Sequence, residues 1–216
     1  MSRSSSSASP TKRERYHHGD LRHSLIQAGL QVLAEQGVEA LTLREVARRA
    51  KVSQAAPYHH FADKADLISA IAQHGFEDFA EALRAGAETM GDGALQRLTG
   101  MGLAYVQFAV ANPNLFRLLF RPELRGGTRD EPAAEAMERP GSAAYPVLLD
   151  AVTAAVTDGS VQGSVEDVAV AALSIVHGLS TLLVDGPIDL RQRPPDTLAR
   201  IVISALGSGI TSQPMP

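Results

Sequence analysis

The twenty residues from Thr42 to Phe61 constrain the fold of this chain more than any other stretch. Thr42 is followed three residues later by Glu45, which is the spacing of a capping box, where two side chains satisfy backbone donors at a helix start. Apolar residues then recur at helical spacing. A second N-cap candidate, Ser53, requires the chain to turn within residues 50–52 and begin another helix. The stretch therefore predicts two short helices joined by a tight turn.

Two such helices are the parts of a helix-turn-helix. This motif lays its first helix across the DNA backbone and presents the N-terminal residues of its second helix to base edges in the major groove. Generic pairs of amphipathic helices share the same apolar pattern, so the pattern alone leaves both interpretations open.

The sequence around this stretch resembles the N-terminal domain of TetR/AcrR-type transcriptional regulators. The resemblance covers about residues 20–68 and is carried, in order, by residues 41–47, 52–53, 58–61 and 63–67. It implies an all-α fold, with a three-helix helix-turn-helix domain followed by a larger helical domain that binds a ligand and dimerises. It also implies a repressor that binds a palindromic double-stranded DNA operator as a dimer and is released by an unknown small-molecule effector.

Nine residues are the candidate DNA contacts. In the family that this chain resembles, the first residues of the second helix meet base edges and later ones touch phosphates. Carried over, Gln54 can hold adenine with two hydrogen bonds, and Ala55 can meet a thymine methyl group. The other candidates, most of them expected at phosphates, are Thr42, Arg44, Ser53, Tyr58, His59, Lys64 and Arg22.

Two residues of the motif depart from the family pattern. Lys51 stands in the turn where the family usually has glycine, and a non-glycine residue with positive φ costs on the order of 1 kcal/mol there. Pro57 cannot donate a backbone hydrogen bond and is tolerated only in the first turn of a helix. We keep the second helix, with a late start or a distortion as the expected consequence of Pro57.

Charge is divided unevenly along the chain. Residues 1–64 carry ten Lys and Arg against six Asp and Glu, a net charge of +4, whereas residues 65–216 carry a net charge of −8. A basic head that contacts DNA and an acidic body that stays off the phosphates would have this distribution. The predicted organisation is a disordered basic tail at 1–15, the DNA-binding domain at 16–64, the ligand-binding and dimerisation domain at 65–210 and a tail at 211–216.

The rest of the chain is predicted to be helical, because no stretch alternates between apolar and polar residues. Asp20 is the expected N-cap of the first helix, and Gly37 is expected to end it in a left-handed conformation. Asp63, with Asp66 three residues later, is expected to cap a long linking helix. The predicted helices are 20–36, 64–89, 94–111, 113–122, 143–157, 165–184 and 196–206, with a loop at 125–140.

The C-terminal part offers candidates for a ligand pocket and a dimer interface. Residues 112–120 and 176–179 resemble a subtype named for a Trp-His-Gly set, although the chain has no Trp and Leu173 stands near that position. The candidate pocket residues are Tyr105, Phe108, Phe116, Phe120, Tyr145 and His177. Plain core packing is the alternative for each of them. Helices 165–184 and 196–206 are apolar over broad faces, which favours a homodimer through a four-helix bundle.

Several functional classes lack the residues they need. The chain has no Cys, so it has no disulfide or thiolate metal site, and a cytoplasmic location fits. The apolar run 168–184 is shorter than the roughly 20 residues of a membrane span. We expect no metal, no cofactor and no catalysis, because no nucleophile elbow, P-loop or dinucleotide fingerprint is present. An activator, a ligand-independent DNA-binding protein and an interaction module that has lost DNA binding remain the alternatives.

Overall fold

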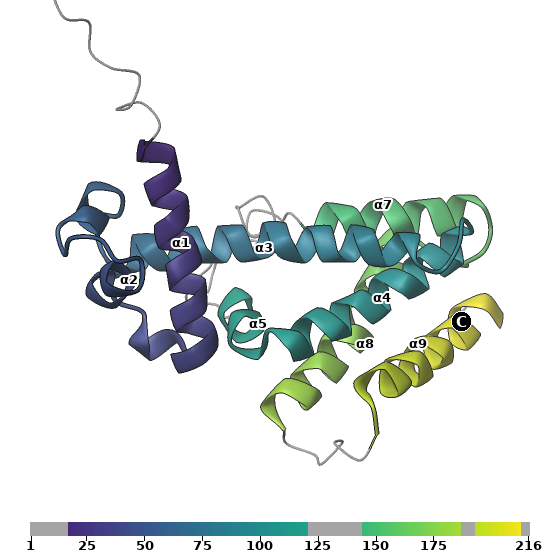
Figure 1. Cartoon of the computed structure of the whole chain (residues 1–216). Coiled ribbons are helices and arrows are strands. Elements are labelled where there is room, and N and C mark those ends of the chain that lie inside the picture. The colour runs from purple at the N-terminus through teal and green to yellow at the C-terminus, as the bar shows by residue number, and fades with distance from the viewer. Residues whose placement is uncertain (1–16, 121–143, 187–192, 213–216) are drawn as a thin grey trace, which may run out of the picture. The chain divides into compact units, whose positions relative to one another are not determined.

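A computed structural model describes residues 17–120, 144–186 and 193–212 of the chain (Figure 1). Over these ranges it forms eight α-helices and two short 3-10 helices and no strand, which confirms the predicted all-α fold. The chain divides into two compact units, residues 1–67 and 68–216. The predicted tail at 1–15, the predicted loop at 125–140 and residues 213–216 lie outside the described residues.

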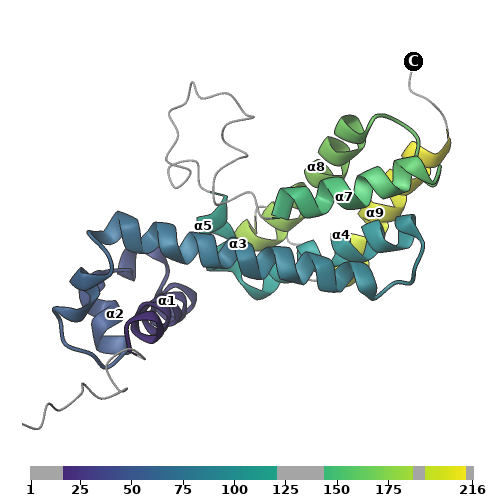
Figure 2. The same cartoon turned by 90° about the horizontal axis from the view of Figure 1, so that it is seen from above.

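The first unit is built on helix α1 (His17–Gln36), which packs against α2 (Leu43–Arg49) (Figure 2). A 3-10 turn, η1 (Val38–Ala40), joins them, and a second one, η2 (Ala56–His59), packs on α2. The largest core residues of this unit with almost no exposed surface are Leu25, Val32, Leu33, Leu41, Val46, Phe61 and Leu67.

Helix α1 ends at Gln36 as predicted, but its start and the conformation of Gly37 after it differ from the prediction. The helix begins at His17, so Asp20 lies within its first turn and is not the N-cap. An acidic residue in the first turn still favours the helix through the helix dipole, which explains the misassignment. Gly37 has the predicted positive φ of 80°, but its ψ of 178° lies outside the left-handed helical region, in a conformation that essentially only glycine adopts.

Helix α2 begins at the predicted cap. The Thr42 hydroxyl accepts the backbone N–H of Glu45 at 3.1 Å. The Glu45 carboxylate does not return to the backbone of Thr42 and instead accepts from the Arg48 guanidinium at 2.5 and 2.8 Å. One half of the capping box is therefore present, and the other half is replaced by an ion pair one turn along the helix.

The turn after α2 is a Schellman motif. The N–H of Val52 bonds to the carbonyl of Ala47 at 3.0 Å, and the N–H of Lys51 bonds to the carbonyl of Arg48 at 3.2 Å. Lys51 has a φ of 58° and is the one non-glycine residue with positive φ in the described part of the chain. The positive φ predicted for this turn residue is confirmed.

The second helix of the motif is shorter than predicted. It is the four-residue turn η2 and not an α-helix starting at Ser53, and the residue before it, Ala55, makes no side-chain capping bond. Pro57 explains the difference, because it lacks the N–H that an α-helix capped by Ser53 would direct to the Ser53 carbonyl. That carbonyl instead accepts from Ala56 at 3.0 Å, and Tyr58 bonds to Ala55 in the same three-residue pattern.

Helix α3 (Lys64–Glu88) starts at the predicted cap, Asp63. The Asp63 carboxylate accepts the N–H of Asp66 at 2.9 Å, and the Asp66 carboxylate accepts the N–H of Ala62 at 3.0 Å. The first turn of α3 belongs to the first unit and the remainder to the second. The helix is therefore the covalent link between the two units.

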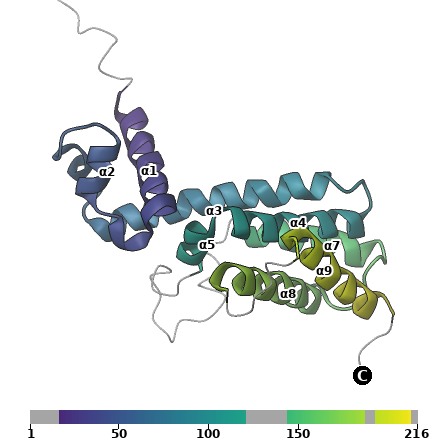
Figure 3. The same cartoon turned by 60° about the horizontal axis from the view of Figure 1, so that its bottom comes forward.

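The second unit is centred on α4 (Ala94–Ala111), which packs against four other helices. These are α5 (Pro113–Leu119), α7 (Ala144–Thr157), α8 (Val165–Asp185) and α9 (Pro195–Ser212). Helices α8 and α9 lie side by side (Figure 3). Helices α3 and α4 approach closely at two glycines, since a Cβ atom on Gly86 would lie 2.3 Å from the Cβ of Ala104 and 2.8 Å from the carbonyl oxygen of Gly100.

Helix α8 is the one helix in the described ranges that is long and apolar enough to cross a membrane, with a mean hydropathy of 1.8 in its most apolar window. Core helices of folded proteins meet the same criterion. Here α8 packs against α4, α7 and α9, and 33% of its most apolar window is buried within the chain.

Candidate nucleic-acid interface and ligand cavity

All nine candidate DNA contacts are exposed. Tyr58 has 60% of its surface exposed, the largest fraction among the exposed large hydrophobic side chains of the described residues. Gln54 and Ala55 lie in the turn before η2, and His59 is the last residue of η2. Residues 53–55, which precede the shortened second helix, are therefore all accessible.

Two arginines of α2 are held by carboxylates within the first unit. Arg48 pairs with Glu45 at 2.5 Å, and Arg49 pairs with Glu35 of α1 at 2.7 Å. The hydrogen bonds from these guanidinium groups hold the pKa of Glu45 and the pKa of Glu35 below their ordinary values. The Arg49–Glu35 pair joins α2 to α1, so Arg49 braces the unit.

Three other cations of the unit have no such partner among the described residues. Arg44, Lys51 and Lys64 are exposed, and none forms an ion pair there. Arg22 differs from them because its guanidinium carbon lies 5.3 Å from the centre of the Phe61 ring, a cation–π contact. Exposed cations that pair with no described carboxylate, in the same unit as the exposed Tyr58 and His59, suit a surface that binds phosphates.

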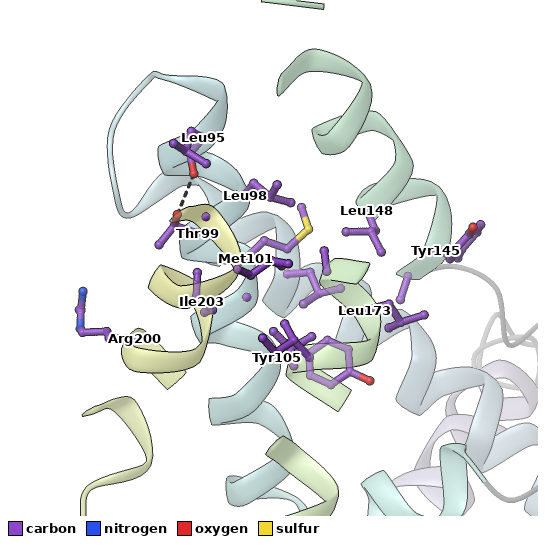
Figure 4. A pocket seen from close by; sticks show the side chains of 18 of the residues that line it. Leu95, Leu98, Thr99, Met101, Tyr105, Tyr145, Leu148, Leu173, Arg200 and Ile203 are labelled. Atoms are coloured by element: carbon purple, nitrogen blue, oxygen red, sulfur yellow. Dashed lines mark hydrogen bonds between the residues drawn. The ribbon is translucent and has the colours of Figure 1, made fainter. Parts of the chain in front are cut away.

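The second unit contains a cavity of about 600 Å³. Residues from α3, α4, α7, α8 and α9 line it, together with Phe120 (Figure 4). Of the six predicted pocket residues, Tyr105, Phe120 and Tyr145 line the cavity.

The other three predicted pocket residues do not line it. Phe116 is 3% exposed and its ring centre lies 4.8 Å from that of Phe120, while Phe108 lies 4.8 Å from Phe79. Both side chains pack behind the wall. The prediction missed this because helical spacing indicates which side chains point inward but not which of them border a cavity.

His177 also lies behind the wall, where its Nδ1 is 2.8 Å from the Tyr105 hydroxyl oxygen. Burial raises the pKa of Tyr105 well above its ordinary value, so this hydroxyl stays neutral. His177 is therefore hydrogen-bonded to a residue of the wall and is not itself part of the wall.

Several wall residues were not predicted from the sequence. Arg200, Ile203 and Gly207 follow one another on α9 at steps of three and four, a helical spacing that marks one face. Thr99 and Leu98 contribute from α4. The spacing of 200, 203 and 207 was a usable signal, but it does not separate a cavity wall from a dimer face.

Two families match this chain over the two units. Residues 25–71 match the family described as bacterial regulatory proteins, tetR family, and residues 98–206, half of the chain, match the tetracyclin repressor-like C-terminal domain. The chain belongs to the TetR family. Members of this family are DNA-binding transcriptional regulators and not enzymes.

Solved TetR-like structures share the fold. A protein with unknown function from Rhodococcus sp. RHA1 is 31% identical over 93% of this chain and 100% of that chain, with a TM-score of 0.76. FadR from Bacillus subtilis, in complex with stearoyl-CoA, is 18% identical over 87% of this chain and 98% of that chain, with a TM-score of 0.68. A TetR family transcription regulator from Marinobacter aquaeolei VT8 is 17% identical over 91% and 98%, with a TM-score of 0.65.

Proposed function

We propose that this TetR-family protein is a cytoplasmic repressor that binds a palindromic operator as a homodimer and is released by a small-molecule ligand. The observation that carries the proposal is the exposed surface of the first unit, where Tyr58, His59 and Gln54 are exposed together with Arg44 and Lys64, which pair with no carboxylate of the described ranges. Residues 16–64 are proposed as the DNA-binding domain and 65–210 as the ligand-binding and dimerisation domain.

Each DNA contact has a proposed role. Gln54 and Ala55 meet base edges in the major groove. Lys64, an exposed cation at the first residue of α3, meets a phosphate. The other proposed contacts, mainly to phosphates, are Thr42, Arg44, Ser53, Tyr58, His59 and Arg22.

Selection of bound duplexes from random DNA, followed by mobility-shift titrations, tests this assignment. Lys64→Ala should weaken binding to all duplexes alike, whereas Gln54→Ala should cost about 1–3 kcal/mol at one base pair and change sequence preference. Arg97→Ala, an exposed cation of the second unit, is the control and should change neither. Unchanged sequence preference in Gln54→Ala would show that Gln54 does not read a base.

The proposed dimer interface is the outer face of α8 and α9. Val170 of α8 is 58% exposed and Ile201 of α9 is 49% exposed, on adjacent helices that are apolar over much of their surface. Exposed apolar groups on neighbouring helices favour association with another chain. Two copies of this helix pair form a four-helix bundle, so that the dimer has two DNA-binding domains for the two halves of the operator.

Charge substitutions test the interface. Ile201→Glu should convert the dimer to a monomer in sedimentation equilibrium and abolish operator binding. Val110→Glu on α4, where the wild-type side chain is 38% exposed, is the matched control and should leave the dimer intact. A dimer that persists in Ile201→Glu and Val170→Glu would place the interface elsewhere.

The cavity supports release by a ligand. Its volume lies within the usual range of small-molecule sites. The stearoyl-CoA complex of the Bacillus subtilis FadR concerns a protein of the same fold and supports a ligand role for the corresponding unit here. A ligand shifts operator binding only by its different affinity for the bound and released states. If compounds that bind the second unit all leave operator affinity unchanged, the induction mechanism is wrong.

The Trp-His-Gly subtype remains a proposal that rests on residues 112–120 and 176–179 alone. Leu173, near the position of the missing Trp, lines the cavity. Leu173→Trp should therefore reduce the cavity and weaken ligand binding if this position has the role of the Trp in that subtype. Unchanged ligand affinity would count against the subtype.

A further inference from the structure

The cavity wall is long and apolar. On α4 it runs from Leu95 to Tyr105, which is about 15 Å of helix at 1.5 Å per residue. On α9 it runs from Arg200 to Ser208, about 12 Å. A wall of this length matches an elongated apolar molecule better than a compact polar one.

Three polar side chains of the wall are already hydrogen-bonded within the protein. The Thr99 hydroxyl donates to the Leu95 carbonyl at 2.8 Å, the dashed line in Figure 4. The Ser208 hydroxyl donates to the Ser204 carbonyl at 2.9 Å. The Tyr105 hydroxyl is hydrogen-bonded within the core and neutral. The interior therefore offers no charge to a ligand, and the part of a ligand inside it has to be uncharged.

Arg200 is the one charged side chain among the described residues of the wall. It is exposed, forms no ion pair within the described part of the chain, and lies at the edge of the lining group in Figure 4. The guanidinium group binds carboxylates and phosphates through paired hydrogen bonds. Since no Asp or Glu of the described residues lines the cavity, a cationic ligand would find no counter-charge there.

We propose that the ligand is an elongated amphipathic anion, with its apolar chain in the cavity and its carboxylate or phosphate end at Arg200. This inference rests on the proposed ligand-binding role of the second unit. It excludes cationic ligands and compact polar metabolites as the main effectors.

Calorimetric titration of the full chain without DNA tests the class of ligand. The probes are octanoate, decanoate, dodecanoate, dodecyl phosphate and dodecylammonium, each kept below the concentration at which it forms micelles. Each added methylene should tighten binding of the carboxylates about fourfold until the cavity is filled. Dodecanoate or dodecyl phosphate should bind at least threefold more tightly than dodecylammonium. Equal affinity for the anions and the cation, or no dependence on chain length, would overturn the inference.

Two variants test separately the contribution of Arg200, at the edge of the cavity wall, and that of the apolar interior. Arg200→Gln should weaken dodecanoate binding about three- to fivefold, the upper part of the range for an exposed ion pair, and should remove the preference over dodecylammonium. Arg97→Gln, an exposed arginine of α4 outside the wall, is the control and should leave both unchanged. If Arg200→Gln still prefers dodecanoate over dodecylammonium as strongly as the wild type does, Arg200 does not bind the anionic end of the ligand.

Leu148→Phe reports on the interior. Leu148 is half-buried in the wall, so a larger ring should occupy part of the cavity and shorten the longest carboxylate that still gains affinity. An unchanged chain-length limit would place the chain outside the cavity. Operator binding measured without any probe separates a failure of this inference from a failure of the proposed function. If the protein binds its operator but none of the probes, only the inference about the ligand is rejected. If the protein does not bind any operator, the proposed function is rejected.

Discussion

Replacing Lys51 by glycine isolates the strain in the turn of the helix-turn-helix. Lys51 holds a φ of 58° in the Schellman motif that ends α2. A left-handed conformation costs a non-glycine residue roughly 1–2 kcal/mol, while glycine loses about 0.5–1 kcal/mol more chain entropy on folding. Lys51→Gly should therefore stabilise the first unit by about 0.5–1 kcal/mol.

Lys51→Ala is the matched control, because it removes the same charge and keeps the penalty. Its stability should stay within about 0.5 kcal/mol of the wild type. Hydrogen exchange of the backbone amides of residues 43–61 in the full chain measures the opening free energy of this unit directly. A glycine variant no more stable than the alanine variant would refute the strain at Lys51.

Three further predictions concern caps, close packing and pH. Asp63→Ala removes the cap of α3 and should cost about 1 kcal/mol in the hydrogen-exchange stability of the first unit, whereas Asp63→Asn should retain most of it. Gly86→Ala forces a Cβ atom to within 2.3 Å of the Ala104 Cβ and should lower the stability of the second unit by about 2–3 kcal/mol in denaturant unfolding. Hydrogen bonds from Arg49 and Arg48 lower the pKa values of Glu35 and Glu45 in the folded protein. The contribution of these two carboxylates to the stability of the first unit is therefore complete above the ordinary pKa of 4.5 and is lost as the pH falls through the folded-state pKa values. Hydrogen exchange of the first unit should therefore show a weaker loss of stability below pH 4.5 in the Glu35→Gln, Glu45→Gln double variant than in the wild type; an equal loss would contradict this.

The caps were the most predictable part of the fold, because their chemistry is local. Thr42 and Asp63 each accept a backbone N–H three residues ahead, as their sequence context indicates. Lys51 was also readable, since the turn needs positive φ whatever residue occupies it. Ser53 was misread because the N–H of Ala56, which a serine cap would accept, bonds to the Ser53 carbonyl instead, and Pro57 has no N–H with which to begin an α-helix there.

The cavity was less predictable, because its wall depends on how five helices pack. The periodicity of α4 and α5 identifies Tyr105 and Phe116 as inward-facing, yet one borders the void and the other packs behind it. Arg200, in contrast, lines the cavity but was not expected to do so. A charged residue on an apolar helix is usually solvated, and only the tertiary structure places it at a cavity rim.

The central claim is that the first unit docks in a DNA groove twice per dimer. Fluorescence anisotropy of the full chain with a duplex selected from random DNA, measured across a salt series, tests it most directly. We expect the selected duplex to contain two half-sites with centres about 34–36 Å apart, or a multiple of that, and we expect binding to weaken with salt with a log–log slope near −0.9 for each phosphate neutralised. A folded, dimeric protein that enriches no sequence and leaves duplex anisotropy unchanged at low salt would contradict it.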